Sequence, residues 1–307
     1  MSRPLRFIPG KKTLVEVTTR TVHSRLLLRP SHQLNEIVLG LLGRAQERYG
    51  VEISSYAFLS NHYHLLLIVD SAKQLADFMG YFNSGLAREA GRLVKWREKF
   101  WSRRYRAIVI SGEPAAQRER LKYVLSHGAK EGLVADPREW PGVHAIRPLL
   151  DGEPVRGFWF NRTQEYAAER RGEEFERLRY ATEYTVELSP LPCWEGLEPE
   201  IRQRRIAEIV EEITVEAKAR REEKGITPMG ADAIRRQDPH ATPLKTKRSY
   251  APLFHAATKR VRAALVEGYR AFVGAFREAA EALKAGNRDA AFPLGSFPPA
   301  LPFVGGG

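Results

Sequence analysis

The alternation of apolar and polar residues divides the first half of the chain into regular elements. A period of two predicts four strands, over residues 14–19, 52–59, 62–69 and 107–110. A period near 3.6 predicts three helices, over residues 31–50, 72–92 and 114–128. Ser31 is suited to cap the first helix and Pro114 to open the last. The order β-α-β-β-α-β-α predicts an α+β fold in which helices pack on an antiparallel sheet.

Beyond Pro148 the pattern becomes mainly helical, with apolar stripes over residues 206–217 and 261–283. Between them, residues 235–262 are rich in proline and hold eight Lys/Arg but one acidic residue. The Pro/Gly-rich tail, residues 292–307, is expected to be extended. We therefore expect one domain over residues 1–148 and a mainly helical extension over residues 149–307.

Charge is distributed unevenly between these two parts. The chain has 307 residues and a net charge of +12. Residues 1–150 hold 24 Lys/Arg against 13 Asp/Glu, and the remainder holds 25 against 24. A basic first half suits a polyanionic partner. A single cysteine argues against a disulfide framework, and no segment resembles a signal peptide or a membrane span, so we expect a cytoplasmic protein without a membrane partner.

The strand over residues 62–69 begins with a histidine pair, His62 and His64, on either side of Tyr63. Because side chains alternate along a strand, both imidazoles should lie on one face and Tyr63 on the other. Two imidazoles on a rigid strand can form half of a divalent-metal site. The alternative is that two histidines on a sheet face only bond to their neighbours.

Tyr123 and His127 lie four residues apart, on one face of the predicted helix over residues 114–128. A phenol, whose pKa is about 10, needs help to attack a phosphodiester at neutral pH. A metal ion held by imidazoles can provide that help by polarising the phosphoryl group. The alternatives are a core tyrosine on an amphipathic helix and a histidine interacting with the carboxyl end of the helix before Gly128.

These residues carry a family resemblance. His62-Tyr63-His64, followed by three leucines, resembles the histidine–hydrophobic–histidine (HUH) motif of single-tyrosine, IS200-like transposases, in particular the REP-associated tyrosine transposases. Further stretches resemble the same family in the same order, namely 18–20, 83–88, 100–105 and 123–141. The resemblance implies a ferredoxin-like HUH fold over residues 1–148, with the sheet and helices described above.

The resemblance also implies the roles of the site residues. Tyr123 would be the nucleophile, and His62 and His64 would bind a divalent metal ion, Mg²⁺ or Mn²⁺. His127 stands where the family usually has Asn or Gln, and it would be the third ligand. An all-nitrogen set of protein ligands would shift the preference from Mg²⁺ towards Mn²⁺ or Zn²⁺.

Basic residues interleaved with aromatic ones suggest where DNA binds. Seven Lys/Arg alternate with four aromatic residues between Arg92 and Arg106, a composition typical of single-strand binding. Alternatively, this stretch is a solvated loop with Phe100 and Trp101 in the core. Residues 235–262 are a second basic candidate, or else a linker. The expected DNA-binding residues are Arg20, Arg88, Arg103, Arg104, Tyr105 and Lys130.

The expected activity is that of a metal-dependent single-stranded DNA endonuclease and strand transferase. It would act beside REP-like hairpins through a 5′-phosphotyrosine intermediate, as a monomer or homodimer associated with the nucleoid. Two alternatives remain open. One is a catalytically silent DNA-binding protein descended from such an enzyme, and the other is a metal-dependent hydrolase in which water attacks in place of Tyr123.

Overall fold

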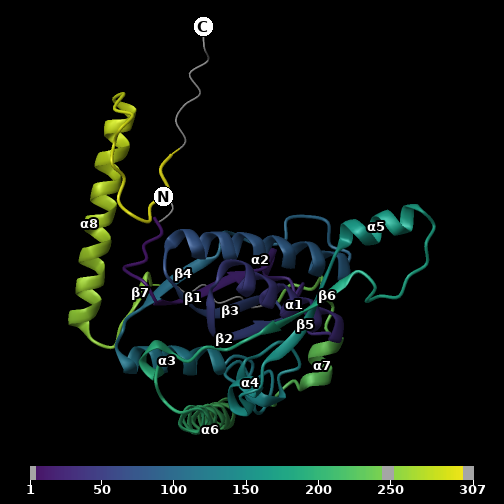
Figure 1. Cartoon of the computed structure of the whole chain (residues 1–307). Coiled ribbons are helices and arrows are strands. Elements are labelled where there is room, and N and C mark those ends of the chain that lie inside the picture. The colour runs from purple at the N-terminus through teal and green to yellow at the C-terminus, as the bar shows by residue number, and fades with distance from the viewer. Residues whose placement is uncertain (1–4, 244–251, 300–307) are drawn as a thin grey trace.

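A computed structural model describes residues 5–243 and 252–299, and it has a five-stranded sheet at its centre (Figure 1). The strand order is β2-β3-β1-β4-β7. The strands are β1 Thr13–Arg20, β2 Glu52–Leu59, β3 His62–Val69, β4 Arg106–Ile110 and β7 Phe254–His255. The first four strands pair antiparallel, as predicted. The short β7 was not predicted; it comes from the carboxyl-terminal extension and pairs parallel to β4, so the sheet is mixed.

Helices cover both faces of this sheet (Figure 1). On one face lie α1 (His32–Tyr49) and α2 (Ala72–Leu93), and on the other lies α3 (Pro114–Leu125). The fully buried Tyr63 points to the α2 side, where its hydroxyl donates a hydrogen bond to Asn83 Oδ1 at 2.5 Å. The predicted α+β fold of helices packed on a sheet is therefore confirmed.

Local hydrogen bonds fix where helix α1 begins and where helix α3 ends. The Ser31 hydroxyl accepts a hydrogen bond from the Leu34 amide at 3.1 Å, which caps α1 as expected. Helix α3 ends at Leu125 instead of Gly128, because the chain tightens there: the His127 amide bonds to the carbonyl of Val124, three residues back. His127 consequently lies in a turn that is held close to the sheet.

The extension after residue 148 contains more strand than predicted. Strands β5 (Val155–Phe160) and β6 (Ala181–Val186) form an antiparallel arm against the outer side of α1. The contact is close, since a Cβ atom on Gly40 of α1 would lie 2.2 Å from the carbonyl carbon of Phe158. The remaining elements are helices α4 Ile146–Asp151, α5 Arg162–Arg170, α6 Pro199–Lys224, α7 Ala231–Arg236 and α8 Lys259–Lys284, and short 3-10 helices Val22–Ser24, Pro137–Glu139 and Pro192–Trp194.

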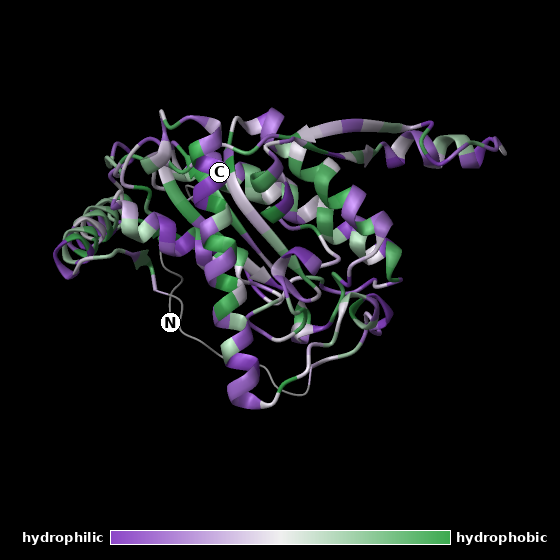
Figure 2. Cartoon of the chain, turned by 90° about the horizontal axis from the view of Figure 1, so that it is seen from below, coloured by the Kyte–Doolittle hydropathy of each residue, from purple (hydrophilic) through white to green (hydrophobic). Residues whose placement is uncertain are grey.

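The two long predicted helices of the extension are both present. Helix α6, nearest the viewer in Figure 2, packs against α3 and α4 through a buried apolar stripe. The stripe consists of Ile206, Ile209, Val210, Ile213 and Ala217. Helix α8 stands away from the sheet (Figure 1), and its residue Tyr269 contacts Phe7 and Phe254.

The predicted basic segment 235–262 spans the end of α7, strand β7 and the first turn of α8. Its central part, residues 244–251, lies outside the described residues, as does the end of the expected extended tail, residues 300–307. Residues 292–299 form no helix or strand. Among the described residues, no helix combines the length and apolar character needed to cross a bilayer.

Candidate functional site

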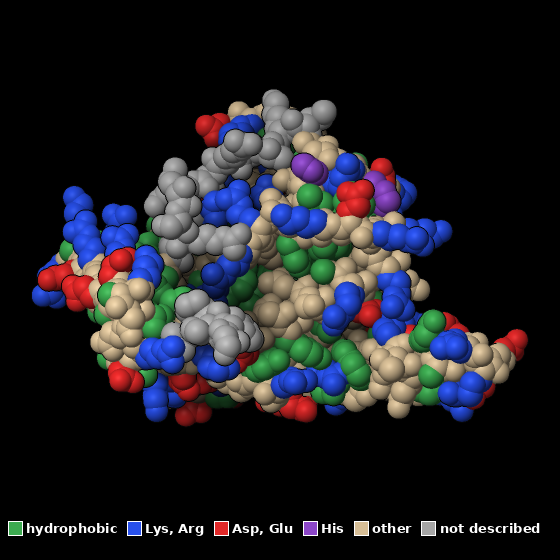
Figure 3. Space-filling model, turned by 90° about the horizontal axis from the view of Figure 1, so that it is seen from above, with side chains coloured by type: hydrophobic (Ala, Val, Ile, Leu, Met, Phe, Trp, Pro, Cys, Tyr) green, Lys and Arg blue, Asp and Glu red, His purple; other side chains and the backbone are tan. Residues whose placement is uncertain are grey.

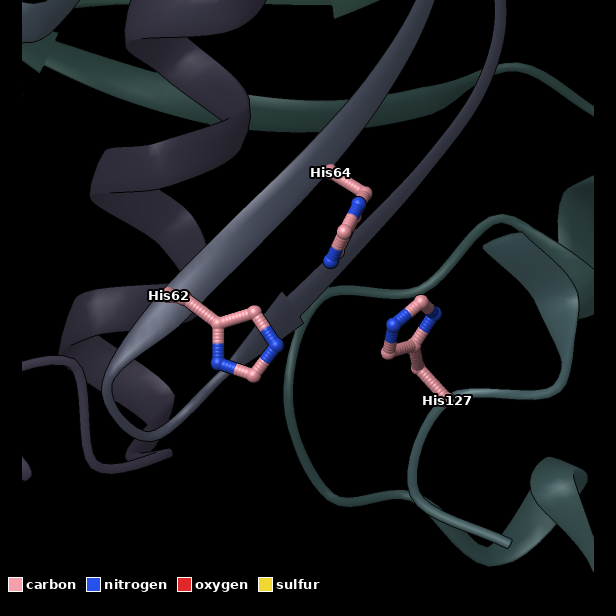
Figure 4. A group of neighbouring side chains, drawn as sticks. All are labelled: His62, His64 and His127. Atoms are coloured by element: carbon pink, nitrogen blue, oxygen red, sulfur yellow. The ribbon is translucent and has the colours of Figure 1, made fainter. Parts of the chain in front are cut away.

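Three histidines converge on the α3 face of the sheet (Figure 4). His62 and His64 project from β3, and His127 faces them from the turn after α3. One ring nitrogen of each lies within 4.8 Å of the other two. The rings of His64 and His127 stack with centroids 4.1 Å apart. The alternation along β3 thus has the predicted result, because both imidazoles share the face opposite Tyr63.

An oxygen acceptor holds the Nδ1 atom of each ring. His64 Nδ1 lies 2.6 Å from the carboxylate of Glu16, and His62 Nδ1 lies 2.7 Å from Asn61 Oδ1. His127 Nδ1 lies 3.0 Å from the carbonyl oxygen of Val124. These oxygens accept hydrogen bonds, so we assign the ring hydrogen to Nδ1 in all three histidines. All three Nε2 atoms then carry the lone pair that an imidazole offers to a cation.

Burial keeps two of these rings neutral. It lowers the pKa values of His62 and His127 well below the usual histidine range, and the nearby Lys130 ammonium also lowers them. Neutral imidazoles fixed by hydrogen bonds at Nδ1 are suited to bind a divalent metal ion through Nε2. The residues therefore fit the metal ion that the sequence predicts. In the structure, His127 Nε2 accepts a hydrogen bond from Lys130 Nζ at 2.8 Å.

Tyr123 lies beside the histidines and is the most exposed member of the group. Its ring centroid is 5.7 Å from that of His64 and 4.9 Å from that of His127, and 38% of its surface is exposed. Two cations lie over the ring: the Arg120 guanidinium at 4.4 Å and Lys130 Nζ at 3.6 Å from the centroid. Burial raises the pKa of the Tyr123 phenol, Glu16 raises it further, and Arg120 opposes them. The phenol is therefore protonated at neutral pH.

Glu16 and Arg120 also belong to this site, although neither is among the site residues predicted from the sequence. Glu16 lies on β1 and is fully buried, and its carboxylate bonds to His64 and to Arg120 Nε. Along β1 it alternates with apolar neighbours and so looks like a solvent-facing position. The strand pairing, which places Glu16 opposite Leu66 and next to His64, is what shows its role.

The expected DNA-binding residues divide between the two faces. Arg20 and Lys130 lie on the histidine side. Burial lowers the pKa of the Arg20 guanidinium, and the nearby, exposed Arg103 lowers it further. Burial also lowers the pKa of Lys130 to about 8. Arg20 and Lys130 therefore lie near Tyr123, and Arg103 lies near Arg20.

The other three expected residues lie on the α2 side of the sheet, which Figure 3 shows with many lysine and arginine side chains. Arg88 is exposed on α2. The Tyr105 hydroxyl bonds to the Leu75 carbonyl of α2 at 3.5 Å, and Arg104 lies 5.7 Å from the Tyr105 ring. Any contact of these residues with DNA would therefore be separate from the histidine site.

The aromatic residues between Arg92 and Arg106 mainly hold the loop in place. Phe100 is buried, and Trp101 donates a hydrogen bond to the Asn83 carbonyl at 3.0 Å, which confirms their assignment to the core. Trp96 contacts Arg25 on one side and His240 of the extension on another. The loop thus joins the sheet to the extension.

The extension also reaches the edge of the histidine site. The Gly230 amide bonds to the Leu133 carbonyl at 2.9 Å, just after Lys130. The Ser60 hydroxyl, two residues before His62, bonds to Gln237 at 3.3 Å. Residues 229–241 therefore border the site on the side of the β2–β3 turn.

Comparisons with known proteins found one matching family model and several similar solved structures. Residues 20–125 match the family model described as "Transposase IS200 like". Among solved structures, a REP-associated tyrosine transposase bound to a REP hairpin matches with 15% identity and a TM-score of 0.41, over 49% of this chain and 86% of that chain. A candidate transposase from Deinococcus radiodurans R1 matches with 16% identity and a TM-score of 0.28, over 39% of this chain and 95% of that chain. No curated protein matches the chain by sequence.

Proposed function

Because residues 20–125 match the IS200-like transposase family model, we propose that this protein cuts and rejoins single-stranded DNA with Tyr123 as the nucleophile. The observation that carries the proposal is the position of Tyr123. Its ring lies within 6 Å of the imidazoles of His64 and His127, two of the three histidines whose ring nitrogens cluster within 4.8 Å, and it lies on the same face of the sheet. One chain provides every side chain of this site, which is therefore complete in a monomer and also in each half of a homodimer.

The proposed reaction exchanges one phosphodiester for another. The Tyr123 oxygen forms a bond to phosphorus, and the bond from phosphorus to the 3′ oxygen of the preceding nucleotide breaks. The phenol loses its proton and the departing 3′ oxygen gains one, so the products are a 5′-phosphotyrosine and a free 3′-hydroxyl. Attack by the 3′-hydroxyl of another strand reverses these steps and joins the new ends.

The cations around Tyr123 bind and orient the phosphate in this proposal. Arg20, Arg103 and Lys130 neutralise its charge, and Arg120 remains paired with Glu16 beside the ring. The partly exposed ring can receive a single strand from solvent.

We propose that His62, His64 and His127 hold a divalent metal ion, Mn²⁺ or Mg²⁺. When bound, this ion polarises the phosphoryl oxygens and absorbs charge that develops on them. Three nitrogen ligands favour Mn²⁺ over Mg²⁺, which prefers oxygen. The target that the motif resemblance implies is a single strand beside a REP-like hairpin.

Incubation with single-stranded DNA from the flanks of the gene, plus Mn²⁺, tests this function on a denaturing gel. The proposal predicts a covalent protein–DNA adduct and a shortened strand with a 3′-hydroxyl. Metal-dependent cutting without an adduct would favour the hydrolase, in which water attacks. Tight binding with neither product would favour the silent DNA-binding protein.

A further inference from the structure

Glu16 is a buried carboxylate in the middle of the sheet. Its neighbours on β1 are apolar, and none of its surface is exposed. Burying a charged group is costly unless other groups pair with it. Both oxygens of Glu16 have such partners, and these partners belong to the two halves of the proposed site.

One oxygen of Glu16 acts on the metal ligands. Oε1 accepts a hydrogen bond from His64 Nδ1 at 2.6 Å, in a pair of which hardly any surface is exposed. This bond keeps the hydrogen on Nδ1 and fixes the ring orientation, so that Nε2 faces His62 and His127. A carboxylate in this position also makes the imidazole a stronger ligand.

The other oxygen acts on the side of the nucleophile. Oε2 accepts a hydrogen bond from Arg120 Nε, and only 15% of the Arg120 side chain is exposed. The held guanidinium lies 4.4 Å from the centre of the Tyr123 ring. The position of Arg120 against this ring therefore depends on the same carboxylate that orients His64.

We propose that Glu16 is a positioning residue that couples the metal ligand His64 to the nucleophile Tyr123 through Arg120. This inference rests on the proposed function for the role of Tyr123. The effects of Glu16 on the His64 tautomer and on metal binding can be measured without any reaction. A purely structural ion pair would stabilise the fold without changing the tautomer of His64 or its affinity for a metal.

Glu16→Gln is the most direct test, because it preserves shape while removing the charge. An amide has one oxygen, so it can accept from His64 or from Arg120 but not from both. We expect Mn²⁺ and Zn²⁺ affinity, measured by calorimetry on the full chain, to fall about 10- to 100-fold. In the metal-free protein, the ¹⁵N NMR signals of His64 should show a mixed population of tautomers.

Two further variants serve as a control for Glu16→Gln and as a separate test of the Arg120 contact. Glu119→Gln changes an exposed carboxylate on α3 and should leave metal affinity and the His64 tautomer unchanged. Arg120→Lys keeps the positive charge but loses the planar group over the ring. It should leave metal affinity within about threefold while slowing adduct formation at saturating metal.

The results separate this inference from the proposed function. Unchanged metal affinity and an unchanged His64 tautomer in Glu16→Gln would overturn the inference, even if the wild type forms the adduct. If the wild type binds metal but forms no adduct, the proposed function fails, and the calorimetry still decides whether Glu16 positions His64. Should Glu16→Gln not fold, Glu16→Asp tests the same point, because its shorter carboxylate cannot span both partners.

Discussion

The ring of Tyr123 lies 5.7 Å from the ring of His64, edge to face, although one belongs to α3 and the other to β3. Two features of the fold produce this proximity. The alternation along β3 turns His64 away from Tyr63, and α3 packs on the face to which His64 points. A phosphodiester that reaches the exposed edge of Tyr123 is therefore also beside the histidine cluster.

The first prediction concerns the identity of the nucleophile. Tyr123→Phe removes one oxygen and little volume, so folding and DNA binding should persist while adduct formation is lost, by at least about 1,000-fold. Tyr105→Phe is the matched control, because Tyr105 lies on the opposite face of the sheet and bonds to Leu75. Denaturing gels of both variants with labelled single strands provide the measurement. An adduct that vanishes only in Tyr105→Phe would show that the nucleophile is misassigned.

The second prediction concerns the metal ligands. His64→Ala should abolish cleavage and lower Mn²⁺ affinity more than tenfold, because it removes one of three clustered nitrogens. DNA affinity should stay within a few fold, since cations outside the cluster provide most of the binding. His32→Ala, an exposed histidine on α1, serves as the control. Cleavage by His64→Ala in the presence of a chelator would contradict the metal assignment.

The third prediction concerns how α6 holds the tyrosine helix. Ile213 is buried in the interface, so Ile213→Ala should lower the free energy of unfolding by about 2–5 kcal/mol. Glu212 bonds to Lys122 at 2.9 Å and also to Arg118, but it is partly exposed, so Glu212→Gln should cost less than about 1 kcal/mol. Urea denaturation measures both values. A larger loss for Glu212→Gln would mean that ion pairs, and not apolar packing, hold α3.

The fourth prediction concerns acid stability. Burial lowers the pKa of His144 to about 3, and its Nδ1 accepts a hydrogen bond from the Ile146 amide at 3.3 Å. The unfolded chain, with a histidine pKa of about 6.5, binds a proton in the range between these values, whereas the folded protein does not. The stability that this group contributes is therefore complete above pH 6.5 and decreases as the pH falls towards 3.

His144→Asn tests this pH dependence, because the amide oxygen can still accept from Ile146. Between pH 7.5 and pH 5, the free energy of unfolding of the wild type should fall by about 2 kcal/mol through this one group. The fall in the variant should be smaller by about the same amount. Exposed His32→Asn should behave like the wild type. Denaturant titrations at the two pH values compare the three proteins, and identical losses in all three would contradict the assignment of His144 as a buried neutral base.

The sequence predicted the fold best where an element is long and contributes many residues to the core. Strands β1, β2 and β3 are buried over almost their whole length, and helices α1 and α2 each bury an apolar stripe. The β5–β6 arm was missed because its strands are half exposed and a helix, α5, joins them in place of a tight turn. Strand β7, of two residues, is too short to show any period. The β5–β6 arm and strand β7 both depend on tertiary contacts, which a local sequence pattern does not reveal.

The site was predictable where spacing alone places side chains together. The two-residue spacing of His62 and His64 and the four-residue spacing of Tyr123 and His127 each define a shared face. That the two faces meet depends on which side of the sheet α3 covers. Glu16 and Arg120 could not be found in this way, because strand pairing and the packing of α3 bring them together.

The most direct test of the account is the chemical identity of the residue that carries the DNA. Wild-type protein, incubated with Mn²⁺ and a cleavable single strand, would be digested with nuclease and protease and then analysed by tandem mass spectrometry. The account predicts a peptide in which the phenolic oxygen of Tyr123 is esterified to a 5′-phosphate, and no such peptide from Tyr123→Phe. A nucleotide attached to any other residue, or strand cleavage with no modified peptide, would contradict it.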